Sequence, residues 1–357
     1  VMRLFRKFTQ STNEAVMDSL YPWMFGQIAI NGITLDLDST VMTRYGTQEG
    51  AARGYNPAKR GRVSHHPLMA FVADTRMIAN CWLRPGNSSS AHNVQAFLAN
   101  TLHRLGDKQV CLLRADSGFA DSAFLDHLDT QPMHYIVALR QNQPLQRALV
   151  NAEGWWVLHD EQGKPVPGIE LTRFRYQPEA WSTPRWVIGI RQHIEQRVAP
   201  KGKTLNLFAD DPVIGQWRFS ALVTDLDLSA TVIWRMYRGR ADCENRIKEL
   251  KYDFAADSFC MKDFWATEAT LNTVMLAYNL MSLLRQVLLK TSAVKHSSIS
   301  VQHTLQTLRY KLFAKPAYIT TESRKPILHL AVAMQQRAWV QGLWDASKTF
   351  DLPAKFT

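Results

Sequence analysis

The sequence predicts an α/β protein built on a mixed sheet, and two observations lead to this prediction. Short apolar runs with strand character alternate with helical periodicity along most of the chain. Between residues 141 and 217 the alternation stops, and the sequence becomes rich in Trp, Gln, Pro and Arg with short β-like runs. We therefore expect an α/β core with a β-rich insertion, and helical segments at both ends of the chain.

The composition suits a globular protein with a polyanionic partner. Hydrophobic residues make up 46% of the 357 residues, and the net charge is +11. A charge of this sign favours nucleic acid over a membrane as the partner. The four cysteines form no CxxC pair, which argues against a zinc ribbon and suits a reducing cytoplasm. The most apolar run, 271–289, is interrupted by polar residues and is expected to be a buried helix.

The first 26 residues show helical periodicity. Thr12 or Asn13 is expected to cap the second of two helices there. We expect residues 1–30 to form a helical lead-in packed on the core. Because the chain starts at Val1 inside this pattern, we also expect it to lack most of an N-terminal segment.

Residues 33–40 alternate as a strand with apolar side chains on one face and Asp36 and Asp38 on the other. Two acids on a buried face need a cationic neighbour. An edge strand with one solvated face is the alternative. If that face meets a metal, Asp38 is the better ligand because it lies nearer the strand's end, and Asp36 would orient a water or pair with a base.

A basic, glycine-rich loop is expected at 41–65, and a β-hairpin at 67–83. Arg60 and Arg62 belong to this loop, which could follow a phosphate backbone or could be an ordinary solvated loop. His65 and His66 are adjacent on a predicted strand and would face opposite ways. They are therefore not expected to share a metal.

Asp116 follows a second apolar strand, 110–114. Loops at the carboxyl ends of strands are where α/β sheets place their chemistry. The alternative is that Asp116 only caps the helix expected from about residue 120, in competition with Ser117 or Asp121.

The stretch from 237 to 251 is predicted to be one amphipathic helix. At 100° per residue, Tyr237, Arg240, Glu244 and Lys251 share an arc of about 60°, with Lys248 at its edge. A solvated face with i,i+4 ion pairs would give the same charge pattern.

The order of these elements is that of a ribonuclease-H-like fold with an insertion before its last helix. Three carboxylates from three elements can converge at one edge of such a sheet. Carboxylate oxygens suit Mg²⁺, and two ions about 3.5–4 Å apart can assist phosphodiester cleavage.

The chain resembles a known family in five motifs that occur in order. They are DLDST, RYGTQEGA with GYNPAKRGRVSHHPL, LRPGN, LRADSGF and YRGRADCENRIKELK. Together they resemble bacterial insertion-sequence transposases of the 1380 family, with a DDE domain of group 1. The resemblance covers about residues 1–290.

This resemblance implies specific roles for residues. Asp38, Asp116 and Glu244 would be the catalytic, metal-binding triad, and Tyr237, Arg240 and Lys251 would contact the transposon end. Lys248, Arg60 and Arg62 are further candidates for DNA contact. An insertion Trp stacks on a flipped base in related transposases, and Trp217 is the candidate here, although a core Trp is the simpler interpretation.

The resemblance also implies Mg²⁺ as cofactor, with Mn²⁺ as a substitute, and strand cleavage and transfer at transposon ends. The partners would be double-stranded DNA, both terminal inverted repeats and target, and a second copy of the chain in a homodimer on DNA. No membrane partner is expected, and the location would be the bacterial cytoplasm at the nucleoid.

The expected division of the chain follows from the same order. It comprises a lead-in at 1–30, a ribonuclease-H-like core at 31–140 and 218–290, a β-rich insertion at 141–217 and a helical segment at 291–357. Two other functions remain open: a DNA-binding relic without catalysis, and a two-carboxylate glycosidase, which the basic charge does not favour.

Overall fold

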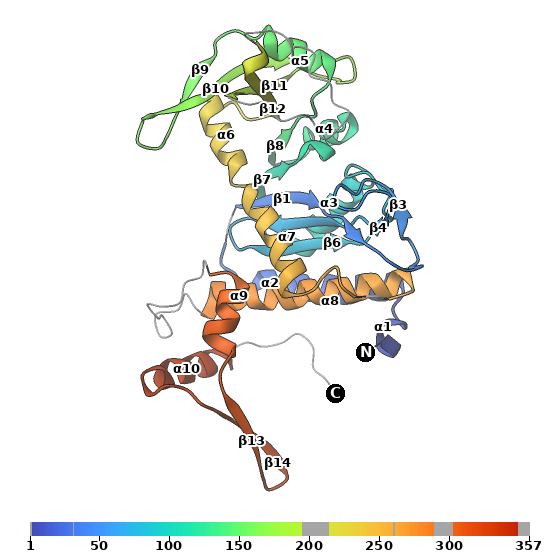
Figure 1. Cartoon of the computed structure of the whole chain (residues 1–357), viewed down its shortest axis with the longest axis vertical. Helices are drawn as coiled ribbons and strands as arrows, with labels where there is room; N and C mark the ends of the chain where they lie inside the picture. Colours follow the sequence, from blue (N-terminus) through green and yellow to red (C-terminus); the bar gives the residue numbers. More distant parts are fainter. Residues whose placement is uncertain (1, 31, 195–213, 260, 289–302, 349–357) are drawn as a thin grey trace.

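The computed structural model describes residues 2–30, 32–194, 214–259, 261–288 and 303–348. Within these residues, one nine-stranded mixed sheet runs through the body of the molecule (Figure 1). Its strand order is β6-β5-β1-β7-β8-β12-β11-β10-β9. This confirms the mixed α/β class predicted from the alternation of strands and helices.

The central part of the sheet consists of β1, β5, β6, β7 and β8. Their bounds are Ile33–Ser39, Leu68–Val72, Met77–Trp82, Val110–Ala115 and His134–Ala138. β5 runs antiparallel to β1 and forms the predicted hairpin with β6, while β7 is parallel to β1 and β8 is parallel to β7. Parallel pairing of β1 and β7 places their carboxyl ends at the same edge of the sheet.

The β-rich stretch continues this sheet instead of forming a separate one. Its strands pair antiparallel, and β12 pairs with β8; their bounds are β9 Trp156–His159, β10 Pro165–Tyr176, β11 Arg185–His193 and β12 Trp217–Thr224. A helix, α5 (Gln143–Val150), precedes these strands and was not predicted. We call β9 to β12 the sheet extension.

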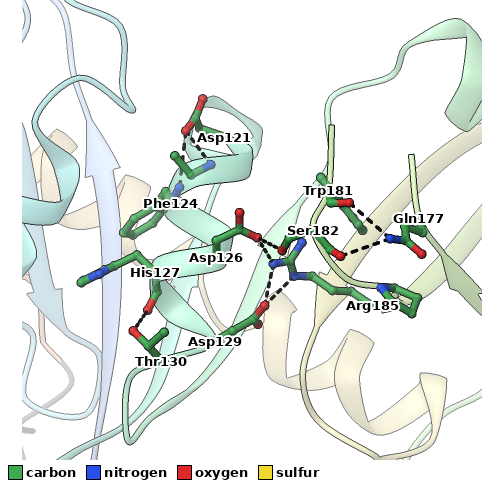
Figure 2. Close-up of polar contacts among 12 residues, drawn as sticks. Asp121, Phe124, Asp126, His127, Asp129, Thr130, Gln177, Trp181, Ser182 and Arg185 are labelled. Carbon is green, nitrogen blue, oxygen red and sulfur yellow. Dashed lines mark hydrogen bonds and ion pairs between the residues drawn. The ribbon is translucent and has the colours of Figure 1, made fainter. Parts of the chain in front are cut away.

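A buried arginine links the sheet extension to α4 (Ser122–Leu128), as Figure 2 shows. Arg185 of β11 is 3% exposed and bonds Asp129 through Nε at 3.0 Å and Nη2 at 2.5 Å, and Asp126 at 2.6 Å. Ser182 donates to Asp126 and Tyr135 donates to Asp129, each at 2.7 Å. We call this cluster the α4 joint.

Helices cover both faces of the sheet. α2 (Gln10–Gly26) lies beside α8 (Phe264–Leu283), and α3 (Val94–Leu105) packs against α2 and β6 (Figure 1). α2 begins one turn earlier than expected, because Thr9 and not Thr12 or Asn13 is its N-cap. Among the described residues, no helix has both the length and the apolar character to cross a bilayer.

The predicted single helix over 237–251 is wrong, because the chain breaks there into α6 (Ala230–Arg238) and α7 (Ala241–Asp253). The Arg240 amide bonds the Tyr237 carbonyl at 2.9 Å and not the Met236 carbonyl that a continuous helix would use. The Met236 carbonyl instead accepts from Arg114 of β7. A long-range partner therefore replaces the helical bond.

The short strands and the C-terminal arm complete the described chain. The basic loop contains a small sheet of β2 (Met42–Thr43), β3 (Ala52–Arg53) and β4 (Val63–His65).

After α8 come a π-helical turn, Leu284–Leu288, then α9 (Leu305–Leu308) and a second π-helical turn, Arg309–Phe313. An antiparallel hairpin, β13 (Ala317–Glu322) and β14 (Lys325–Leu330), corrects the expectation of a wholly helical C-terminal segment. The last described element is α10 (Met334–Ser347), and α1 spans Met2–Phe5 near the other end.

Candidate active site

Asp36 of β1 is fixed by a buried ion pair with Arg114. Arg114 lies opposite Asp36 in the parallel register of β1 and β7. Its Nε is 2.6 Å from Asp36 Oδ1 and its Nη2 is 2.8 Å from Oδ2, and the two residues are 6% and 2% exposed. Both carboxylate oxygens are thus held by one guanidinium, which is the strong, bidentate form of this interaction. Asp36 therefore has a base as its partner, in line with the supporting role expected from its position.

Asp38 lies two residues further on the same strand and is less well compensated. Its Oδ2 is 3.1 Å from Arg240 Nη2, and its Oδ1 accepts the Ser39 amide at 2.8 Å. Burial raises the pKa of the Asp38 carboxyl to about 6; the Arg240 charge opposes this rise and the Asp116 charge adds to it. A cation bound beside this carboxylate would stabilise its charged form and lower its pKa.

Asp116 lies beside Asp38 because of the strand register. Leu37 and Ala115 are partners in the parallel pair β1–β7, so the residues that follow them emerge at the same edge. Asp116 is partly exposed, and its Oδ1 accepts the Gly118 amide at 2.9 Å, which caps the short 3-10 turn Ser117–Phe119. Asp116 therefore does act as a cap, but of this short turn; the helix α4 is capped by Asp121. One oxygen in the cap leaves the other available.

Glu244 lies in the first turn of α7 with an exposed side chain. Its neighbour Cys243 is buried, and burial and then the nearby Asp38 charge raise the pKa of this thiol. Across the described residues, no group of three or more His, Cys, Asp and Glu side chains is placed to hold a metal ion. The structure therefore brings Asp38 and Asp116 together and places Glu244 on the adjoining helix without adding it to a three-residue cluster.

Tyr237 and Arg240 are both directed at the carboxyl edge of β1 and β7. The Tyr237 hydroxyl is 3.4 Å from the Ala115 carbonyl, and burial raises the pKa of this phenol. Arg240 is 7% exposed, donates to the Leu37 carbonyl at 3.1 Å and forms an ion pair with Asp38. In this structure Arg240 neutralises a candidate catalytic acid.

The two lysines of α7 differ in their surroundings. Lys251 donates to the Val41 carbonyl at 3.0 Å, and burial lowers the pKa of its ammonium group. Lys248 is exposed. Of the pair, Lys248 is the one that a ligand can reach without exchange of a protein contact.

The basic loop contributes both exposed and buried arginines. Arg60 and Arg62 are exposed, and the Arg62 guanidinium lies 5.8 Å from the Tyr45 ring centroid. Arg44, by contrast, is 3% exposed and bonds His65 Nδ1 at 3.0 Å and the Asp257 carbonyl at 2.9 Å. Arg44 therefore ties the loop to the chain after α7, a role that the sequence did not indicate.

Trp217 is half-buried at the start of β12, in the sheet extension. The Arg191 guanidinium lies 4.6 Å from its ring centroid, and the His193 ring meets it edge-on at 5.4 Å. The pairing of β12 with β8 involves the other end of the strand, at Leu222–Thr224. Trp217 thus belongs to an aromatic and cationic cluster of the extension, and its proposed contact with a base stays a prediction.

Arg114 is the residue of this region that sequence analysis missed. The available signal was an arginine inside an apolar strand, two positions before Asp116. Its partner Asp36 is 78 positions earlier in the chain, and only the sheet register brings the two together.

Comparison with known proteins gave one family. A family model described as transposase DDE domain group 1 matches residues 1–346. No curated protein matches the chain. Among solved structures, the cryo-EM structure of a piggyBac transposase synaptic complex with hairpin DNA matches at a TM-score of 0.40 and 12% identity, over 71% of this chain and 48% of that chain. This chain thus spans about half the length of that one.

Proposed function

The chain belongs to the transposase DDE domain group 1 family, and on that premise we propose that it cuts and joins DNA strands at the ends of an insertion sequence of the 1380 family. The proposed catalytic carboxylates are Asp38, Asp116 and Glu244. The observation that carries the proposal is that Asp38 and Asp116 lie at the same carboxyl edge of β1 and β7, where the Asp116 charge acts on Asp38. The central strand order β6-β5-β1-β7-β8, with β5 antiparallel and β7 and β8 parallel to β1, supports a ribonuclease-H-like core.

Mg²⁺, with Mn²⁺ as a substitute, fits the donor set of this edge. The groups present are carboxylates, which these hard cations prefer. Burial, and after it the nearby Asp116 charge, raises the pKa of Asp38, and a cation would stabilise the charged form of this carboxyl. Asp38 and Asp116 would hold the ion, and Glu244 would join them from α7. When bound, the ion would stabilise negative charge on the phosphodiester oxygens. Arg114 and Asp36 would keep β1 and β7 in register beneath it.

Contacts with DNA are proposed for the basic residues around this edge. Lys248, Arg60 and Arg62 are exposed and could neutralise phosphates. Arg240 and Lys251 now bond protein acceptors, so a contact with phosphate requires these bonds to exchange. Tyr237 is held against β7 and would contact the transposon end only at the site itself.

The remaining elements of the proposal concern partners. We propose double-stranded DNA with terminal inverted repeats, a target duplex, and a homodimer on DNA, at the nucleoid of a bacterial cytoplasm. A second candidate function is DNA binding without catalysis. It is favoured by one observation, namely that Glu244 is not clustered with the other two acids in the described chain.

Cleavage of a labelled duplex bearing the element's own end, with Mg²⁺ or Mn²⁺, tests the proposal. We expect metal-dependent nicking that EDTA abolishes, and a loss of at least about a hundredfold in Asp116→Asn and Glu244→Gln. Asp121→Asn is the matched control, because this acid only caps α4 and asparagine is an equally good cap. Tight DNA binding by the unaltered chain without nicking in either metal would establish the second candidate function.

A further inference from the structure

Arg114 connects three elements that meet at the candidate site. Through Nε and Nη2 it holds Asp36 of β1, and through Nη1 it donates to the Met236 carbonyl near the end of α6. It does so from β7, whose next residue but one is Asp116. The side chain is 7% exposed, so water contributes little to its solvation. A guanidinium with all three nitrogens bonded in this way has a single orientation.

The bond from Arg114 to Met236 lies at the break between α6 and α7. The Met236 carbonyl is the acceptor that the Arg240 amide would use in a continuous helix. The Arg240 amide instead bonds the Tyr237 carbonyl, and α7 starts at Ala241. Directly after the break, Arg240 forms an ion pair with Asp38, and Glu244 lies in the first turn of α7.

Gly239 provides an independent sign that this junction is built around Arg114. A Cβ at Gly239 would lie 2.6 Å from Arg114 Nη1, closer than such contacts occur. Yet the backbone of Gly239 is right-handed helical, with φ −57° and ψ −21°, so any residue could adopt it. The absence of a side chain here is therefore required by the guanidinium and not by the backbone.

We propose that Arg114 is a positioning residue, which sets the place of α7, and with it Arg240 and Glu244, relative to Asp38 and Asp116. It touches neither DNA nor metal, and acts through Asp36, the Met236 carbonyl and the helix break. The inference rests on the proposed function for its catalytic consequence, but its effect on the α6–α7 junction stands apart from catalysis. Lysine cannot replace arginine here, because one ammonium cannot hold a carboxylate in a fork and reach a third acceptor.

Two variants on different elements test this inference through the same contact. Arg114→Lys is expected to weaken Mn²⁺ binding, measured by titration calorimetry, by about tenfold and cleavage by about a hundredfold, as for other residues that orient metal ligands. Gly239→Ala is expected to cause similar losses, because its methyl group displaces the guanidinium. Since both changes break one contact, their combination should be no worse than the more severe single change. Glu179→Gln, an exposed acid in the turn after β10, is the control.

The outcome separates positioning from mere stabilisation. If Arg114 only stabilises the sheet, Arg114→Lys lowers the urea midpoint but leaves Mn²⁺ affinity and the cleavage rate of the folded protein unchanged, and the inference is overturned. It is also overturned if Gly239→Ala raises stability and retains Mn²⁺ affinity, as helix propensity alone would predict. If the unaltered chain never cleaves DNA, the proposed function fails, and the Mn²⁺ and urea measurements still decide the role of Arg114.

Discussion

Two regions of this molecule place arginine beside aspartate, but the pKa of an aspartate is lowered in one region and raised in the other. At the α4 joint, Arg185 and Ser182 both donate to Asp126, as Figure 2 shows. Those hydrogen bonds, first Ser182 and then Arg185, lower the pKa of Asp126, whereas burial raises the pKa of Asp38 to about 6.

Solvent access explains much of this difference. Both regions carry one more acid than base. At the α4 joint, Asp126 and Asp129 face Arg185, and at the candidate site Asp36, Asp38 and Asp116 face Arg114 and Arg240. The Asp126 and Asp129 side chains are 41% and 32% exposed, so water compensates them, while the Asp38 side chain is 10% exposed. The comparison shows that the same pair of residue types serves as a structural link when water and donors complete it. At the candidate site, one negative charge remains without a basic partner or water to compensate it, and a bound cation could compensate it.

The largest effect is expected from removing Asp38, the less well compensated acid of β1. Asp38→Asn should lower single-turnover cleavage by at least about a thousandfold, because a metal ligand contributes several kcal/mol to the transition state. DNA affinity should stay within about threefold. Asp36→Asn should keep measurable cleavage, since Asp36 is fully occupied by Arg114. An inactive Asp36→Asn beside an active Asp38→Asn would reverse the assignment.

Removing the arginine of the α4 joint should cost stability and not chemistry. Arg185→Met is expected to reduce the free energy of unfolding by about 2–4 kcal/mol, at the lower end because its acids reach solvent. Urea denaturation measures it, with Arg173→Met as control. Arg173 pairs with Asp227, which is 81% exposed, so that change should cost less than about 1 kcal/mol. Lost cleavage in folded Arg185→Met would show that the joint also shapes the site.

The pH dependence of stability should have opposite signs in the two regions. In metal-free protein, the folded state binds the Asp38 proton more tightly than the unfolded state does. Stability is therefore lost as pH rises from about 4 to 6, by up to about 3 kcal/mol, and Asp38→Asn removes that loss. Asp126 contributes stability above its unfolded pKa that is lost as pH falls through its lowered folded pKa. Urea unfolding at about pH 3, 4.5 and 8 separates the two effects, since Asp38→Asn acts between about 4.5 and 8 and Asp126→Asn acts below about 4. Equal signs would contradict the comparison.

The smallest effects are expected from exposed cations near the site. Lys248→Ala, and Arg60→Ala with Arg62→Ala, should each lower the slope of log affinity against log salt by about one per charge removed. Filter binding to duplex DNA between about 50 and 200 mM salt measures this. Arg185→Met should leave the slope unaltered, because this cation already has two acidic partners. No change in the Lys248→Ala slope would place that residue on an ordinary solvated face.

Local pattern was enough to predict much of the fold. The alternation at 33–40 and the apolar run at 110–114 correspond to β1 and β7, and the hairpin expected at 67–83 corresponds to β5 and β6. Ser229, a residue type that favours this position, caps α6. These features depend on residues close together in the chain, whose hydrophobic period and capping groups are visible in the sequence.

The sequence by itself therefore determined the central strands, their carboxyl ends and the acids Asp38 and Asp116 at those ends. Tertiary structure alone decided that Arg114 holds Asp36, that α6 and α7 separate at Gly239, and that the β-rich stretch extends the central sheet. The physical reason is the same each time. A guanidinium on one strand competes for a carbonyl on a distant helix, and strand register decides which side chains meet. Neither interaction leaves a periodic trace in the sequence, because each joins residues 78 or more positions apart.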